Sequence, residues 1–213
     1  YSVSAAGGTP VKLNTELPPD GDVSSVGLQF SPDGSRVLYR ADQDTDGVWE
    51  IYSRVVSQTW NVASGQWDGS ANWDQGEVPG EVMTINVNPV SFATVTGPVT
   101  DTSIFSLNIG ATDTGVATLA LQPSVTLTVL NQTDISTRGA LIGSGHFDSQ
   151  GGLVNDGRVE LDGMTIAAPT IENYGVISGG GTIDAPAIEN HGVISGGSTI
   201  DAQLMNSASG EVR

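Results

Sequence analysis

The sequence predicts an all-β protein whose larger, C-terminal part is a parallel β-solenoid, also called a β-helix. Residues 171–185 (IENYGVISGGGTIDA) recur 17 residues later, almost unchanged, as residues 188–202 (IENHGVISGGSTIDA). A repeat this short cannot bury a core by itself and has to stack on its neighbours. Runs such as GVIS and TIDA alternate apolar and polar residues, as strands do. Gly-Gly and Asn-x-Gly between these runs are expected to supply positive φ at tight corners. Short strands separated by such corners predict small triangular coils.

The repeat extends in both directions and sets the length of the coils. Residues 153–169 form an upstream copy, and residues 141–148 form a shorter one in which Phe147 stands in the place of Ile183. Residues 204–213 begin a further coil. We therefore expect coils of about 17 residues from residue 141 onward.

Stacking these copies predicts which side chains align along the axis. Two inward columns are expected, an asparagine ladder and an apolar core column. The ladder consists of Asn155, Asn173, Asn190 and Asn206, and the core column consists of Ile171, Ile188 and Met205. A third row consists of Asp148, Asp184 and Asp201, interrupted by Ala167. Because stacked carboxylates repel one another, we expect this third row to face solvent or a cation.

Irregular strands precede the regular repeats and extend the predicted solenoid to residues 82–213. Their sequences alternate apolar and polar residues and are separated by turn residues such as Asn-Pro and Gly-Pro. The expected strands are 83–88, 92–96, 105–109, 117–121 and 125–129. Their uneven spacing predicts broader coils here.

The N-terminal segment, residues 1–56, carries a different pattern. Ser31-Pro32-Asp33-Gly34 lies between two apolar alternating runs, which predicts a hairpin. Tyr-Ser recurs at residues 1–2 and 52–53. These features of residues 1–55 resemble the blade repeat of TolB-like and WD40-like (PD40) β-propellers. The resemblance implies a propeller-like β-blade segment, belonging either to a propeller whose other blades lie upstream or to a small sheet packed against the solenoid.

Residues 57–81 form a tryptophan-rich segment that we expect to be a cap or linker. It contains Trp60, Trp67 and Trp73 in the pattern W-x6-W-x4-NW. Together with the repeats, this segment of residues 59–213 resembles bacterial extracellular β-solenoid proteins of the autotransporter-like kind. One interpretation is a plug over the open end of the solenoid. The other is a ligand-binding platform on which Trp67 and Trp73 stack against sugar rings.

The strongest candidate for a metal site is the loop Asp42-Gln43-Asp44-Thr45-Asp46-Gly47. Carboxylates at alternate loop positions can converge on one Ca²⁺ ion. The expected ligands are Asp42, Asp44, Asp46, the carbonyl of Val48, and Glu50. Ser53 stands at the twelfth position, where an EF-hand needs a bidentate glutamate, so the loop is not an EF-hand. The alternatives are a calcium-binding hairpin loop and an acidic turn without an ion.

Composition narrows the classes of partner. The 213 residues carry a net charge of −17, from 24 acidic and 7 scattered basic residues, which argues against nucleic acid as a partner. No apolar run approaches about 18 residues, so we expect no membrane insertion. The chain has no cysteine, no initiator methionine and no signal-peptide pattern, which suggests a processed or truncated piece of a longer protein.

The sequence offers little for catalysis. The two histidines, His146 and His191, fall at different positions of the repeat and are not expected to meet. We therefore expect a non-enzymatic structural protein, secreted or on a bacterial cell surface, that acts as a stalk, an adhesin or a self-assembling filament subunit. Its expected partners are other copies, through the solenoid ends, or surface glycans. The alternative is a carbohydrate-binding or polysaccharide-cleaving β-helix module.

Overall fold

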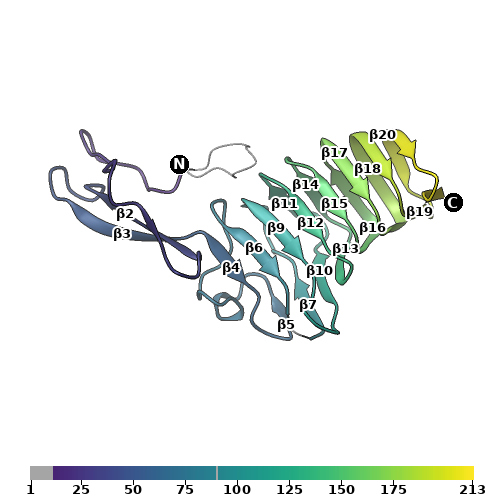
Figure 1. The fold of residues 1–213 in the computed structure, drawn as a ribbon, viewed down its shortest axis with the longest axis horizontal. Coiled ribbons are helices and arrows are strands. Elements are labelled where there is room, and N and C mark those ends of the chain that lie inside the picture. Colours follow the sequence, from purple (N-terminus) through teal and green to yellow (C-terminus); the bar gives the residue numbers. More distant parts are fainter. Residues whose placement is uncertain (1–11, 90) are drawn as a thin grey trace.

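The computed structural model describes residues 12–89 and 91–213 as an all-β structure in two parts. A small antiparallel sheet comes first, and a parallel β-solenoid of about seven turns follows it (Figure 1). The predicted solenoid is therefore confirmed. A propeller blade is not shown by the first part, and residues 1–11 of the expected blade lie outside the described residues.

The antiparallel sheet consists of β1 (Gln29–Phe30), β2 (Arg36–Ala41) and β3 (Glu50–Val55). Between β1 and β2 lies the predicted hairpin turn, in which Gly34 has a φ of 71° that favours glycine. The Asp33 carboxylate holds this turn. It accepts hydrogen bonds from the Ser31 hydroxyl at 2.5 Å and from the hydroxyl and amide of Ser35 at 2.9 and 3.1 Å. These bonds, that of Ser31 foremost, lower the pKa of Asp33 to about 2.

The solenoid is built from three parallel sheets, to each of which nearly every coil contributes one strand. The first sheet contains β5 (Ser64–Gln66), β7 (Ala93–Thr96), β10 (Ala117–Leu121), β13 (Gly139–Gly143), the starts of β16 (Arg158–Ala167) and β18 (Val176–Asn190), β19 (Val193–Ser195) and β21 (Glu211–Val212). The second contains β8 (Thr102–Ile104), β11 (Thr126–Val129), β14 (His146–Ser149), later parts of β16 and β18, and the start of β20 (Thr199–Asn206). The third contains β4 (Ser57–Thr59), β6 (Thr84–Val87), β9 (Ser106–Ile109), β12 (Thr133–Ile135), β15 (Leu153–Asn155), β17 (Thr170–Asn173) and the ends of β18 and β20.

The one helical element in the described part of the chain is the three-residue 3-10 turn η1 (Ser70–Asn72). No helix there is long and apolar enough to cross a membrane.

Aliphatic side chains of successive coils lie over one another in the interior. The first sheet aligns Val95, Leu119, Leu141, Val159, Ile177 and Ile194. The second aligns Leu127, Phe147, Ile166, Ile183 and Ile200. All of these except Ile200 are at most 2% exposed, and Phe147 takes the place of Ile183 as predicted. Burying each such side chain stabilises the fold by about 1.5–3 kcal/mol, so the stacked columns hold the coils together.

The corner between the third and first sheets contains the predicted asparagine ladder. The Nδ2 of Asn155 donates to the Oδ1 of Asn173 at 2.7 Å, and Asn173 donates in the same way to Asn190 at 2.7 Å. Asn190 donates to Asn206 at 2.6 Å. Because buried amides need hydrogen-bond partners, each coil satisfies the one before it. Earlier coils fill this inner corner column with apolar side chains instead, namely Val87, Ile109 and Ile135.

The predicted row of aspartates is confirmed as well. Asp148, Ala167, Asp184 and Asp201 align on the outer side of the second sheet. Asp184 and Asp201 are exposed, and Asp148 is half-buried. The row therefore faces solvent, as stacked carboxylates require.

The predicted core column of Ile171, Ile188 and Met205 is wrong at its last member. Ile171 and Ile188 align, but Leu204 lies over Ile188, while Met205 lies over Glu189 and is 52% exposed. The cause is a register shift between Asp184 and Ala187, where the next coil has one residue fewer. One missing residue in a strand turns the following side chains to the opposite face.

Positive φ was expected for the glycines at both kinds of corner. The structure shows it at one kind only, and the glycines of the other kind serve a different purpose. Gly179 and Gly196, in the Gly-Gly corners, have φ near 100°. The glycines of the Asn-x-Gly corners are not among those with positive φ. They permit close stacking instead, since a Cβ on Gly192 would overlap the carbonyl oxygen of Gly175.

Candidate functional surface

Polar and aromatic groups gather on the outside of the corner between the third and first sheets. One residue of each coil lies there, directly after the inner corner column. We call this row the corner strip; it consists of Asn61, Asn88, Gly110, Ser136, Asp156, Tyr174, His191 and Ser207. From Gly110 onward, the amide of each strip residue donates to a carbonyl of the coil before it, at 2.7–2.9 Å. The strip therefore runs in register along the solenoid.

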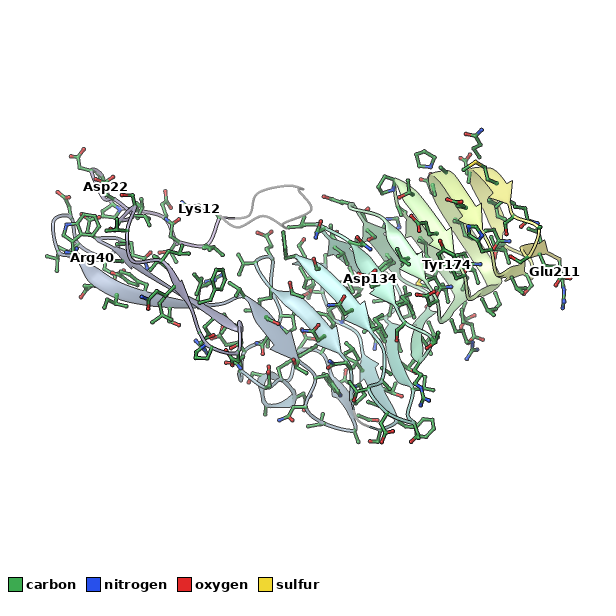
Figure 2. All side chains as sticks on the ribbon, viewed as in Figure 1. Lys12, Asp22, Arg40, Asp134, Tyr174 and Glu211 are labelled. Carbon is green, nitrogen blue, oxygen red and sulfur yellow. The ribbon has the colours of Figure 1, made fainter. Side chains whose placement is uncertain are left out.

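A second outward row lies beside the corner strip, on the third sheet. Asn86, Asn108 and Asp134 align in it, followed by Val154, Glu172 and Glu189. Asn108 donates from Nδ2 to the Oδ1 of Asn86 at 2.8 Å. The row changes from amides to carboxylates along the axis, so the acidic character of the corner increases toward the C-terminal coils. Figure 2 labels two acidic or aromatic members of this corner, Asp134 and Tyr174.

Two cavities of about 290 Å³ each open at the earlier coils of this corner. The first is lined mainly by Asn88, Asn108, Gly110, Asp134, Ser136 and Asp156. The second is lined by Thr59, Trp60, Asn61, Val62, Ala63, Asn88, Pro89 and Ser91. Because Asn88 lines both, the two cavities adjoin one another along the strip.

Two polar atoms at this junction lack partners. The Nε1 of Trp60 and the Oδ1 of Asn88 are buried and make no hydrogen bond within the described part of the chain. Trp60 is itself only 2% exposed. A buried donor or acceptor without a partner costs about 1–3 kcal/mol.

An aromatic pair occupies the later coils of the strip. The rings of Tyr174 and His191 stack with centroids 4.7 Å apart and planes at 6°. The Nε2 of His191 lies 3.2 Å from the Oε1 of Glu189, and the Tyr174 hydroxyl donates to Glu172 at 3.5 Å. Partial burial, and then the charges of Glu172 and Glu189, raise the pKa of Tyr174. The pair remains accessible, because Tyr174 is 48% exposed.

The tryptophans for which a plug and a sugar platform were the two interpretations lie in the interior. Trp67 is 0% and Trp73 is 2% exposed. Trp73 packs edge to face between Trp60 and Trp67, with ring centroids 5.0 and 5.1 Å away, and donates from Nε1 to the carbonyl of Trp67 at 2.8 Å. The three rings fill the first coil of the solenoid, because aromatic side chains supply enough apolar volume to close an open core. Trp67 and Trp73 therefore present no ring face to a glycan.

The acidic loop of residues 42–50 uses its first carboxylate to hold its own backbone. Asp42 is 3% exposed, and its two oxygens accept hydrogen bonds from the amides of Asp22 and Gly47. These bonds, that of Asp22 first, lower the pKa of Asp42. Asp44, Asp46 and Val48 are exposed, and Glu50 accepts a hydrogen bond from the Tyr52 hydroxyl at 2.8 Å. Within the described residues, no group of three or more carboxylate or imidazole side chains is arranged to hold a metal ion.

The sequence missed the cavities of the corner strip but contained part of the signal for its aromatic pair. The 17-residue repeat alone places Tyr174 next to His191. It also separates the two histidines, and His146 indeed lies on the second sheet, between Thr126 and Thr165. Asn88 belongs to an early coil without the repeat, so no sequence alignment of coils could place it in the same row as Asp156.

Comparison with known proteins found no matching family model, no matching curated protein and no matching solved structure.

Proposed function

We propose that this chain is a non-enzymatic structural protein, secreted or displayed on a bacterial cell surface, in which the solenoid serves as a stiff stalk. One observation carries the proposal: the side-chain columns run from coil to coil, and in the C-terminal half the asparagine ladder locks the register. Each coil is bonded to the next by three parallel sheets, so bending has to break hydrogen bonds and core contacts at once. A rod of this kind is suited to holding another part at a distance.

The surface chemistry suits exposure to an aqueous exterior. The net charge of −17 keeps copies apart at low ionic strength and favours solubility. The rows of aspartate and glutamate repeat along the rod, so this repulsion is distributed over its length. The resemblance of residues 59–213 to autotransporter-like proteins favours the same location.

Self-association is the second element of the proposal. In the described part of the chain, β20 and β21 pair with other strands on one side only. An unpaired parallel edge accepts another strand, either from a continuing coil or from a second copy. Edge-to-edge addition of copies would convert the stalk into a filament subunit.

Sedimentation velocity, with and without Ca²⁺, tests the proposal. A stalk sediments as one monomer with a high frictional ratio, and a filament subunit gives a concentration-dependent series of elongated species. A compact monomer with a frictional ratio near that of a sphere would contradict both. A change on adding Ca²⁺ would show that the chain binds the ion, and an identical profile would favour an acidic loop without an ion.

A further inference from the structure

The small antiparallel sheet ends at an open strand edge. In the described part of the chain, β3 pairs with β2 and with no other strand. The amide of Val56 donates to the carbonyl of Ser35 at 2.8 Å, which fixes the phase of this ladder. Alternate residues of an antiparallel strand direct their amide and carbonyl to opposite sides. The backbone groups of Ile51 and Ser53 therefore face the open edge.

The open edge of β3 has none of the devices that usually protect such an edge. Natural sheet edges are blunted by proline, by lysine, by bulges or by a covering segment. β3 contains neither proline nor lysine, and it pairs with β2 without a bulge along its whole length. Its Ile51 is 77% exposed. A regular edge that carries an exposed isoleucine is a template for a further strand.

The charges on β3 are complementary to those of a second copy of β3. In an antiparallel pair with a two-fold axis at Tyr52, Glu50 of each copy lies opposite Arg54 of the other. Both side chains are exposed, and on β2 they lie opposite the uncharged Ala41 and Val37. Arg54 takes part in no ion pair within the described residues. Opposite charges directly across two strands stabilise the pairing.

The backbone and the side chains favour the same register. With the axis at Tyr52, Ile51 of each copy lies opposite Ser53 of the other, so that the amides and carbonyls at both open edges are paired. The two Tyr52 rings then meet at the axis, on the same face as the ion pairs. Moving the axis to Ser53 would place Glu50 opposite Val56 and break both ion pairs. The charge pattern therefore specifies one register.

We infer that two copies of this chain pair through β3 and form a dimer with two-fold symmetry. The pairing joins the two small sheets into one continuous antiparallel sheet. β3 leads directly into β4 of the first coil, so antiparallel pairing directs the two solenoids away from each other (Figure 1). The contact is closed, because each copy uses its only β3 edge and no third copy can be added. It is separate from the solenoid edge at β20 and β21.

Sedimentation equilibrium over a range of protein concentrations tests the dimer. The parent should show a reversible equilibrium between one chain of 21.9 kDa and a pair of twice that mass. Ser53→Pro removes an amide of the open edge, where a single chain tolerates proline, and should raise the dissociation constant about tenfold or more. Ser53→Ala keeps this amide and, as the matched control, should pair as the parent does. Association through β20 and β21 would survive Ser53→Pro.

Charge reversal tests the partner and the register together. Arg54→Glu places like charges opposite one another in a pair of variant chains, and so does Glu50→Arg. Each variant alone should pair about tenfold or more weakly than the parent. A mixture of the two variants should pair again as a heterodimer, because every cross-strand pair then joins opposite charges.

A cysteine at the axis provides a direct test of the geometry, because the chain has no cysteine of its own. Residues directly opposite in a pair without mutual hydrogen bonds have Cα atoms about 4.5 Å apart, which a disulfide can bridge. Tyr52→Cys should therefore form a covalent dimer on mild oxidation. Ser53→Cys is the control, because its two copies lie on a diagonal more than about 7 Å apart and should not be linked.

Three results would overturn the inference: the parent remains a single chain at every concentration, a folded Ser53→Pro pairs as the parent does, or the mixed charge variants pair no better than each alone. Circular dichroism verifies that Ser53→Pro folds, and the charge variants decide the question if it does not. None of these outcomes bears on the shape of the solenoid, so a failure here is distinguishable from a failure of the stalk proposal.

Discussion

The asparagine ladder illustrates how single residues fix the register of the solenoid. Asn155, Asn173 and Asn190 are each 0% exposed, where an amide without partners would be costly. The Nδ2 of each also lies 3.3–3.4 Å from a backbone carbonyl, but its shorter bond, of 2.6–2.7 Å, goes to the asparagine of the next coil. A slip by one residue would leave several buried amides without partners, so the ladder selects one register over its neighbours.

Replacing a central member of the ladder should therefore destabilise the protein more than replacing its end. Asn173→Ala removes the acceptor of Asn155 and the donor to Asn190. We expect a loss of about 2–5 kcal/mol, from one or two unsatisfied buried groups at about 1–3 kcal/mol each. Asn206→Ala, at the exposed end, is the control and should cost less. Urea unfolding followed by circular dichroism measures both, and equal losses would show that the ladder does not act along its length.

The turn carboxylate Asp33 gives a prediction on pH. Its pKa lies at about 2 in the folded protein, below the ordinary value of 3.8. A lowered pKa means that the contribution of Asp33 to stability is present above pH 4 and is lost as pH falls toward 2. Ser31→Ala should raise this pKa, because the Ser31 hydroxyl is its largest cause. An NMR titration of the Asp33 carboxyl group measures the shift, and an unchanged titration in Ser31→Ala would contradict the hydrogen-bonded turn.

The solenoid elements could be predicted where the sequence repeats and not where it varies. The C-terminal coils follow a period of about 17 residues, so the ladder, whose members are 18, 17 and 16 residues apart, and the aspartate row could be aligned from the repeated motifs. Met205 was misplaced because β20 has one residue fewer than β18 in the stretch that follows Asp201. The sequence does not show where such a β-bulge lies. The corner cavities lie in early coils of unequal length, so only the structure shows that Asn88 and Asp156 line the same cavity.

For the tryptophan segment, the sequence pattern does not predict whether the side chains are buried or exposed. The spacing of Trp60, Trp67 and Trp73 is compatible with a core plug and with a sugar platform, and only the packing of the first coil decides between them. β4 and β5 pair in parallel with β6 and β7, so this segment is the first coil of the solenoid. Its rings fill the space that aliphatic columns fill elsewhere.

Truncating a buried ring should accordingly affect stability. We expect Trp67→Ala to cost about 3–5 kcal/mol, because it leaves a large cavity beneath the first coil. Trp49→Ala is the matched control, since Trp49 is 40% exposed and contacts Arg40 at the surface. Thermal unfolding compares the two variants with the parent. A Trp67→Ala protein as stable as Trp49→Ala would contradict the plug.

On the scale of the whole molecule, the same columns that stabilise each coil make the solenoid one continuous body. The aliphatic columns of the first and second sheets continue through successive coils to β19 and β20. Successive coils rise by about 4.8 Å, so about seven turns extend roughly 34 Å along the axis. Stiffness along the axis is what the proposed stalk requires.

Small-angle X-ray scattering of the purified chain tests this central claim most directly. A stiff solenoid predicts a scattering profile that matches the one calculated from the structure and is unchanged between low and high salt. A profile that the structure does not reproduce would contradict the account. So would a profile that broadens with salt, as expected of coils that bend relative to one another.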